Sequence, residues 1–202
     1  VDASRRSGAG YIDLEFAPVR QLLLGAAGRV EEYSDFGSTT TGKLTARFEA
    51  VRGIALRGAV SSGFRAPSLG QSYFSSTATN FIVIDGVSTP FDIRTFPVGS
   101  EEAQILGARE LQPEKSRNYS AGLAWQPINR VSLTADYYHI EIDDRIVLSG
   151  NFIGDDIQAL LEERGFSGVR GGRFFTNAVD TKTDGVDVIF QTAFDVASLG
   201  LS

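Results

Sequence analysis

The sequence contains no cysteine and no methionine, and only one histidine and one tryptophan among its 202 residues. Without cysteine there is no disulfide framework, no thiolate metal site and no thiol nucleophile. Basic residues are also scarce, since 19 Lys and Arg stand against 25 Asp and Glu, which gives a net charge of −6. Nucleic-acid-binding domains usually carry a basic patch, so this composition argues against a nucleic-acid partner.

Long apolar runs are missing as well. No stretch of about 18 apolar residues is present, and this excludes a transmembrane helix. A transmembrane β-barrel stays possible, because its signal is weak and spread over many short strands. The chain starts at Val1 with the polar stretch VDASRRSGAG and no signal peptide, so we expect a processed product or a piece of a longer protein.

Apolar and polar residues alternate with a period of two through most of the chain, which predicts β-strands. The seven expected strands are residues 11–18, 22–33, 43–51, 54–65, 118–126, 130–148 and 185–196. Most have about ten residues or more, against the roughly 5–6 usual in soluble sheets. A tilted strand needs about 9–11 residues to cross a bilayer. The sixth run changes parity near Tyr137–Tyr138, which either a β-bulge or a change of environment would explain.

The expected connections alternate between short and long. Short links are residues 17–20, 51–53, 127–129 and 197–200, and long links are residues 34–42, 67–113 and 149–172. Outer-membrane barrels have tight turns at one end and long loops at the other, whereas compact soluble domains rarely carry such loops. Aromatic residues near the strand ends, such as Tyr119, Trp125 and Tyr137, suit an interfacial girdle. Within the last long link, residues 150–165 predict a short helix that Asp155 or Asp156 would cap and Gly165 would end.

Five sequence blocks, in consistent order, resemble the TonB-dependent outer-membrane receptors. The stretch SSGFRAPSLGQ resembles their FRAPS-type signature. The other four blocks are GRVEEYSDFGSTTTGKL, LQPEKSRNYSAGLAWQP, VSLTADYYHIEIDDRIV and RFFTNAVDTKTDGVDV. The departures from the family pattern, at Gly42, Ser120 and Asp187, bear only on the subfamily.

The resemblance implies an all-β, antiparallel up-and-down meander within a plugged transmembrane barrel of about 22 strands. About seven strands and one short loop helix would belong to this chain. Residues 1–202 would then be a partial barrel, with the plug domain, the TonB box and the C-terminal strands outside it. The implied function is active uptake of a scarce nutrient, such as a ferric siderophore, in the outer membrane of a Gram-negative bacterium. The implied partners are outer-membrane lipid, the nutrient, and the TonB complex acting through the absent N-terminal region.

Candidate ligand-binding residues lie in the fourth strand and in the long link after it. Arg57 and Arg65 would point into the lumen, where an arginine either pairs with carboxylates or contacts an anionic ligand. A solvated lumenal charge is the simpler interpretation of each. Tyr73, Phe74 and Phe81 are loop aromatics of the kind that recognise planar chelators or sugars.

The chain offers little for metal binding or catalysis. His139, Glu141 and Asp143 share one strand face and could in principle hold a cation. A lone histidine among surface carboxylates is more often a rim residue, so we expect no metal and no cofactor. No Ser/His/Asp arrangement and no phosphate-binding glycine loop is present, so we expect no enzyme.

Two other classes remain open: a soluble β-sandwich that binds a carbohydrate or other ligand, and an outer-membrane enzyme or adhesin of different strand number. A sandwich would bury its apolar strand face in a core, whereas a barrel would turn that face to lipid. The positions that separate these two alternatives are Leu22, Leu24, Phe48, Leu56, Val60, Leu123, Leu133, Val188 and Phe190.

Overall fold

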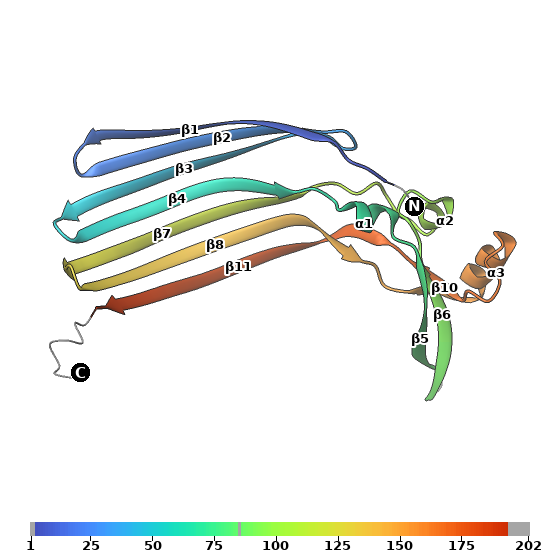
Figure 1. Ribbon diagram of the computed structural model, residues 1–202. Helices are drawn as coiled ribbons and strands as arrows, with labels where there is room; N and C mark the ends of the chain where they lie inside the picture. The colour runs from blue at the N-terminus through green and yellow to red at the C-terminus, as the bar shows by residue number, and fades with distance from the viewer. Residues whose placement is uncertain (1–2, 85, 194–202) are drawn as a thin grey trace, which may run out of the picture.

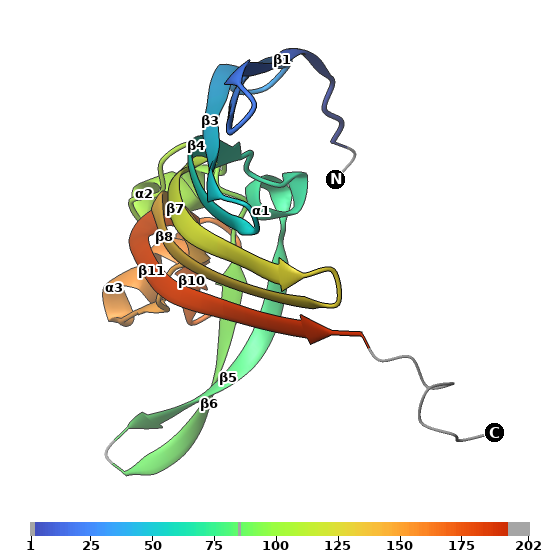
Figure 2. The ribbon, with the colours of Figure 1, turned by 90° about the vertical axis from the view of Figure 1, so that its left-hand side faces the viewer.

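The computed structural model describes residues 3–84 and 86–193 and is dominated by one antiparallel sheet (Figure 1). Its strand order is β1-β2-β3-β4-β7-β8-β11, so neighbours in the sheet follow one another along the chain, as the meander prediction requires. Seen along the strands, the sheet bends into an open arc (Figure 2). The bounds are β1 (Ser7–Val19), β2 (Leu22–Tyr33), β3 (Gly37–Val51), β4 (Ile54–Arg65), β7 (Glu114–Ile128), β8 (Val131–Leu148) and β11 (Phe175–Thr192). Residues 194–196 of the expected seventh strand lie outside the described residues.

The two faces of this sheet differ as the alternation predicts. Leu14, Val188 and Phe190 on the apolar face are each more than half exposed. Of the nine positions that separate a barrel from a sandwich, all but Leu22 and Leu133 are exposed, and those two are half-buried. The polar face carries charged, hydroxyl and small side chains. A packed core therefore does not lie on the wall of the arc.

The buried core lies at one end of the sheet, in a compact assembly that we call the cap, residues 66–113 and 149–174 (Figure 1). A second sheet, of order β5-β6-β10-β9, and three short helices build it. Its elements are α1 (Leu69–Tyr73), β5 (Ser76–Ile84), β6 (Val87–Thr95), α2 (Glu101–Ile105), β9 (Phe152–Ile153), α3 (Asp155–Glu163) and β10 (Gly171–Arg173). Phe96, Ala103 and Leu161 are almost fully buried there, and Ile146 of β8 joins them. In the described part of the chain, no helix is long and apolar enough to cross a membrane.

Two of the expected connections are wrong. The link between β2 and β3 is residues 34–36 and not 34–42, because β3 pairs with β2 in continuous register as far as Gly37 opposite Tyr33. A positive φ of 84° at Gly37 closes the turn. The segment 67–113 is not a structureless loop, since it folds into α1, the β5–β6 hairpin and α2. The chain therefore has more than one short helix.

The parity change in β8 has its cause in the environment rather than in a bulge at Tyr137–Tyr138. The register of β8 with β7 is unbroken from Lys115 opposite Asp143 to Trp125 opposite Leu133. Irregular pairing occurs further along, between β8 and β11, near Asp144 with its φ of 58°. Beyond that point β8 stays paired with β11 as far as Leu148 opposite Phe175, and Ile146 packs into the cap core. The expected helix is confirmed as α3, but Gly154 stands at its N-cap and no side chain caps it.

Candidate functional site

Arg57 lies on the polar face of β4 and reaches across β7 to Asp136 of β8. Its Nε lies 2.7 Å from Asp136 Oδ1, and its Nη2 contacts the other carboxylate oxygen. Gly122 stands between the two in register, and a Cβ there would overlap the Asp136 carboxylate. The missing side chain at position 122 is what allows the ion pair to span two strand spacings. Arg57 thus braces the wall and has its strongest partner within the chain.

Arg65, the last residue of β4, pairs with Glu114, the first residue of β7. The Arg65 Nε donates to Glu114 Oε2 at 3.0 Å, and the carboxylate also accepts the backbone N–H of Ile146 at 2.8 Å. Glu114 is only 5% exposed and lies at the end of β7 next to the cap, beyond the apolar stretch of that strand. Burial raises the pKa of Glu114, but the hydrogen bonds from Arg65 and Ile146 outweigh it and hold the pKa below its ordinary value. Arg65 therefore fastens the cap to the wall.

Tyr73 of α1 lines a pocket of about 270 Å³ on the cap, which we call the cap pocket. Arg5 forms one side of it. Its Nε lies 3.0 Å and 2.9 Å from the two Asp35 carboxylate oxygens, its Nη2 donates to the Pro67 carbonyl at 2.6 Å, and its guanidinium lies 5.2 Å from the centre of the Phe36 ring. The pocket residues are Arg5, Asp35, Phe36, Pro67, Ser72, Tyr73, Val98, Gly99, Gln104, Glu110 and Leu111.

The five candidate ligand residues do not converge. Phe74 ends α1 and is 49% exposed, and Phe81 is 72% exposed on the β5–β6 hairpin opposite Pro90. Neither lines the cap pocket, and neither do Arg57 and Arg65. Sequence reasoning missed the other pocket residues because they come from segments far apart in the chain, and no local pattern marks them.

The acidic side chains around His139 are engaged by neighbouring cations. Asp184 Oδ1 lies 2.7 Å from His139 Nδ1, and Glu141 Oε1 lies 2.6 Å from Lys182 Nζ and 3.4 Å from His139 Nε2. Asp143 lies 3.9 Å from Arg117. Among the residues with described positions, no three such side chains are placed to hold a metal ion.

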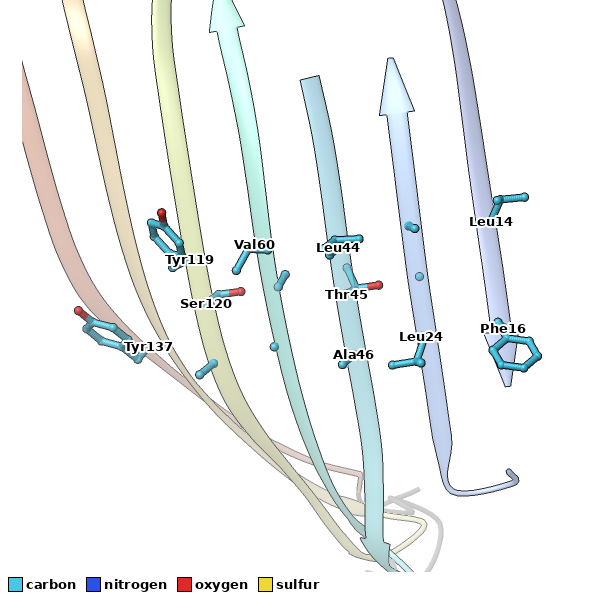
Figure 3. Close-up of a pocket in the computed structure, with 15 residues that line it drawn as sticks. Leu14, Phe16, Leu24, Leu44, Thr45, Ala46, Val60, Tyr119, Ser120 and Tyr137 are labelled. Carbon is cyan, nitrogen blue, oxygen red and sulfur yellow. The ribbon is translucent and has the colours of Figure 1, made fainter. Parts of the chain in front are cut away.

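A shallow depression of about 770 Å³, which we call the hollow, lies on the apolar face (Figure 3). Its depth comes from small residues on adjoining strands, among them Ala26, Ala46 and Gly58. Larger side chains surround these, with Leu14 and Phe16 at one end and Tyr119 and Tyr137 at the other (Figure 3). The remaining lining residues are Leu24, Gly25, Leu44, Thr45, Ala59, Val60, Ser120 and Ala121.

A family model described as TonB dependent receptor-like, beta-barrel, matches residues 1–202. The chain belongs to this family. TonB-dependent receptors are proteins of the Gram-negative outer membrane, and that is the location of this chain. The exposed apolar face fits that location, and the soluble sandwich alternative is therefore wrong.

Solved structures of other TonB-dependent receptors share the fold. The siderophore receptor PirA of Pseudomonas aeruginosa superposes with a TM-score of 0.67 at 16% identity, over 91% of this chain and 30% of that one. PirA of Acinetobacter baumannii superposes with a TM-score of 0.66 at 15% sequence identity, over 94% of this chain and 26% of that one. A mutant of the ferric enterobactin receptor PfeA of P. aeruginosa superposes with a TM-score of 0.67 at 13% sequence identity, over 92% of this chain and 24% of that one. The chain thus spans between about a quarter and a third of the length of these receptors.

Proposed function

We propose that this TonB-dependent receptor chain forms part of the wall and cap of a transporter that takes up a scarce nutrient, with a ferric siderophore as the first candidate. The cap and the cap pocket support the proposal, because they lie at the end of the sheet that carries the long connections, as the extracellular loops of outer-membrane barrels do. The structural neighbours named as siderophore receptors favour this ligand class.

In this proposal the two faces divide the work. The apolar face contacts outer-membrane lipid, and the polar face lines the lumen of a larger barrel, of about 22 strands, that holds a plug domain. Energy arrives through the TonB complex acting on segments outside residues 1–202. The chain contributes binding and passage, with no covalent step.

The candidate residues take different roles within this function. Tyr73, Phe74 and Phe81 are exposed aromatics at the cap and contact the nutrient on arrival. Arg57 and Arg65 are already paired with carboxylates, so they hold the wall and cap in shape and present only residual positive charge to a ligand.

The test is binding of a ⁵⁵Fe-loaded siderophore panel to cells that express the full-length receptor. Tyr73→Ala and Phe81→Ala should each weaken binding of the transported siderophore about tenfold, since a buried aromatic contact contributes about 1–2 kcal/mol. Phe190→Ala, an aromatic deletion of similar size on the apolar face, is the matched control and should leave binding unchanged. Unaltered binding in both cap variants would contradict the assignment of these residues.

A further inference from the structure

A polar border adjoins the end of the hollow that β7 and β8 form. Tyr119 and Tyr137 line that end of the hollow. Because alternate residues of a strand share a face, Arg117 follows Tyr119 on the apolar face of β7, about 7 Å closer to the cap. Lys115 comes next on the same face. The corresponding positions on β8 and β11 are His139, Glu141, Asp143, Lys182 and Asp184.

Glu141 and Asp184 in this border have close cationic or hydrogen-bonding partners, whereas Arg117 has only long ion pairs, with Glu141 and Asp143. Lys182 lies 2.6 Å from Glu141, and His139 and the Tyr137 hydroxyl both contact Asp184. The Arg117 side chain is 62% exposed, and its nearest carboxylate oxygens are 3.9 Å and 4.0 Å away. The border therefore presents an exposed guanidinium, with Lys115 on the same strand face, beside the end of the hollow that Tyr119 and Tyr137 line.

We propose that the hollow and Arg117 together bind one anionic, phosphate-bearing lipid of the outer leaflet. An acyl chain lies in the hollow over Ala46 and Gly58, and the phosphate of the head group accepts hydrogen bonds from Arg117 with Lys115 beside it. This proposal uses the family membership for the orientation of the apolar face. It does not depend on which nutrient the receptor takes up.

The size and chemistry of the depression favour a lipid over a protein partner. A volume of about 770 Å³ falls in the usual range of roughly 300–1,000 Å³ for sites that hold one small molecule. A stable protein contact buries about 800 Å² on each partner, far more than the hollow offers. An apolar cavity with exposed cations beside one end complements an acyl chain with an anionic head. Phosphate and guanidinium form bidentate hydrogen bonds, which gives the head group a fixed position.

The experiment measures lipid that stays bound to the full-length receptor after extraction from outer membranes and extended washing in a mild detergent. Native mass spectrometry and a phosphorus assay report the lipid phosphate per barrel. Arg117→Ala should lower it about fivefold, which is the effect of removing one basic contact at a membrane surface. Ala46→Phe, which fills the hollow, should lower it at least as far.

Two controls separate the site from general effects. Lys43→Ala removes the same charge from the polar face, and Val188→Phe places the same aromatic side chain on the apolar face outside the hollow. Both should retain lipid as the parent does, and heat-modifiable migration verifies that every variant has folded. Equal retention in Arg117→Ala and Lys43→Ala would overturn the proposal, as would a bound lipid without phosphate or a polypeptide in place of lipid. Uptake assays on the same strains test the nutrient function separately, since loss of uptake with retained lipid would count only against that function.

Discussion

Single residues in this chain decide which charges are available to a ligand. Arg57 and Arg65 look alike in sequence, as two arginines on the same face of β4, yet each is held by a different carboxylate. Asp136 reaches Arg57 only because position 122 is glycine, and Glu114 is fixed by burial and by the Ile146 backbone. Such pairs are worth little when exposed and more when one partner is buried. The buried Glu114 is therefore the more consequential of the two.

Replacing Glu114 with glutamine should loosen the cap. The change weakens the Arg65 contact while keeping the shape of the side chain, and we expect a loss of about 1–3 kcal/mol in the free energy of cap opening. Limited proteolysis of the receptor on intact cells would measure it as faster cleavage within residues 66–113. Glu163→Gln, an exposed carboxylate of α3, should have no effect.

The same carboxylate predicts how the cap responds to acid. In the folded protein the pKa of Glu114 lies below its ordinary value of 4.5. Its contribution to the stability of the closed cap is therefore complete above pH 4.5 and is lost as the pH falls through the folded pKa. Protease resistance of the parent cap should stay level from about pH 7 to 5 and then fall. In Glu114→Gln this acid-dependent part should vanish. An identical acid profile in both proteins would show that other groups set the response.

At the scale of elements, strand β10 holds the β5–β6 hairpin to the rest of the cap. Strand β10 pairs in parallel with β6, where Gly171 lies opposite Ile93, and antiparallel with β9, where Gly171 lies opposite Ile153. A Cβ at position 171 would lie 2.6 Å from the Phe152 carbonyl oxygen. Gly171→Ala should therefore free the β5–β6 hairpin and expose it to protease, while the barrel keeps its heat-modifiable migration. Gly150→Ala, at a glycine with open space around it, is the control. A hairpin that stays protected in Gly171→Ala would contradict this role of β10.

The wall strands could be predicted from sequence, whereas the cap could not. Alternation places Leu14 or Val188 on the apolar face without any knowledge of the partner strand. A strand between an apolar and a polar environment has apolar and polar residues at alternate positions, so its own sequence shows which residues face each side. The cap core joins Phe96, Leu161 and Ile146 from segments far apart, so no local period marks them. One local signal does point to part of the cap, since an Asp-Gly dipeptide between two apolar runs favours a hairpin. The cap pocket could not be predicted from the sequence for the same reason, because its residues also come from segments far apart in the chain.

The whole sheet separates lipid on its apolar face from a polar environment on the other. The free-energy cost of introducing a charged side chain therefore depends on the face that receives it. Leu123 lies on the apolar face between Tyr119 and Trp125, and Ala124 follows it on the polar face. Leu123→Arg should lower the free energy of unfolding by about 2–4 kcal/mol, the usual cost of arginine at the centre of a bilayer. Urea unfolding of the full-length receptor in lipid vesicles would measure this. Ala124→Arg should cost much less, and equal costs for both would refute the assignment of the faces.

Strands β4 and β7 pair without interruption from Ile54 opposite Trp125 to Arg65 opposite Glu114, although residues 66–113 separate them in sequence. Helices α1 and α2 and the β5–β6 hairpin therefore enter and leave the wall at one point, and the register of the wall does not depend on what is inserted there. A lineage under pressure from phages, toxins or competing nutrients could exchange this segment without redesigning the barrel. The same property makes the Arg65–Glu114 junction a suitable position for exchanging this segment of the cap between receptors.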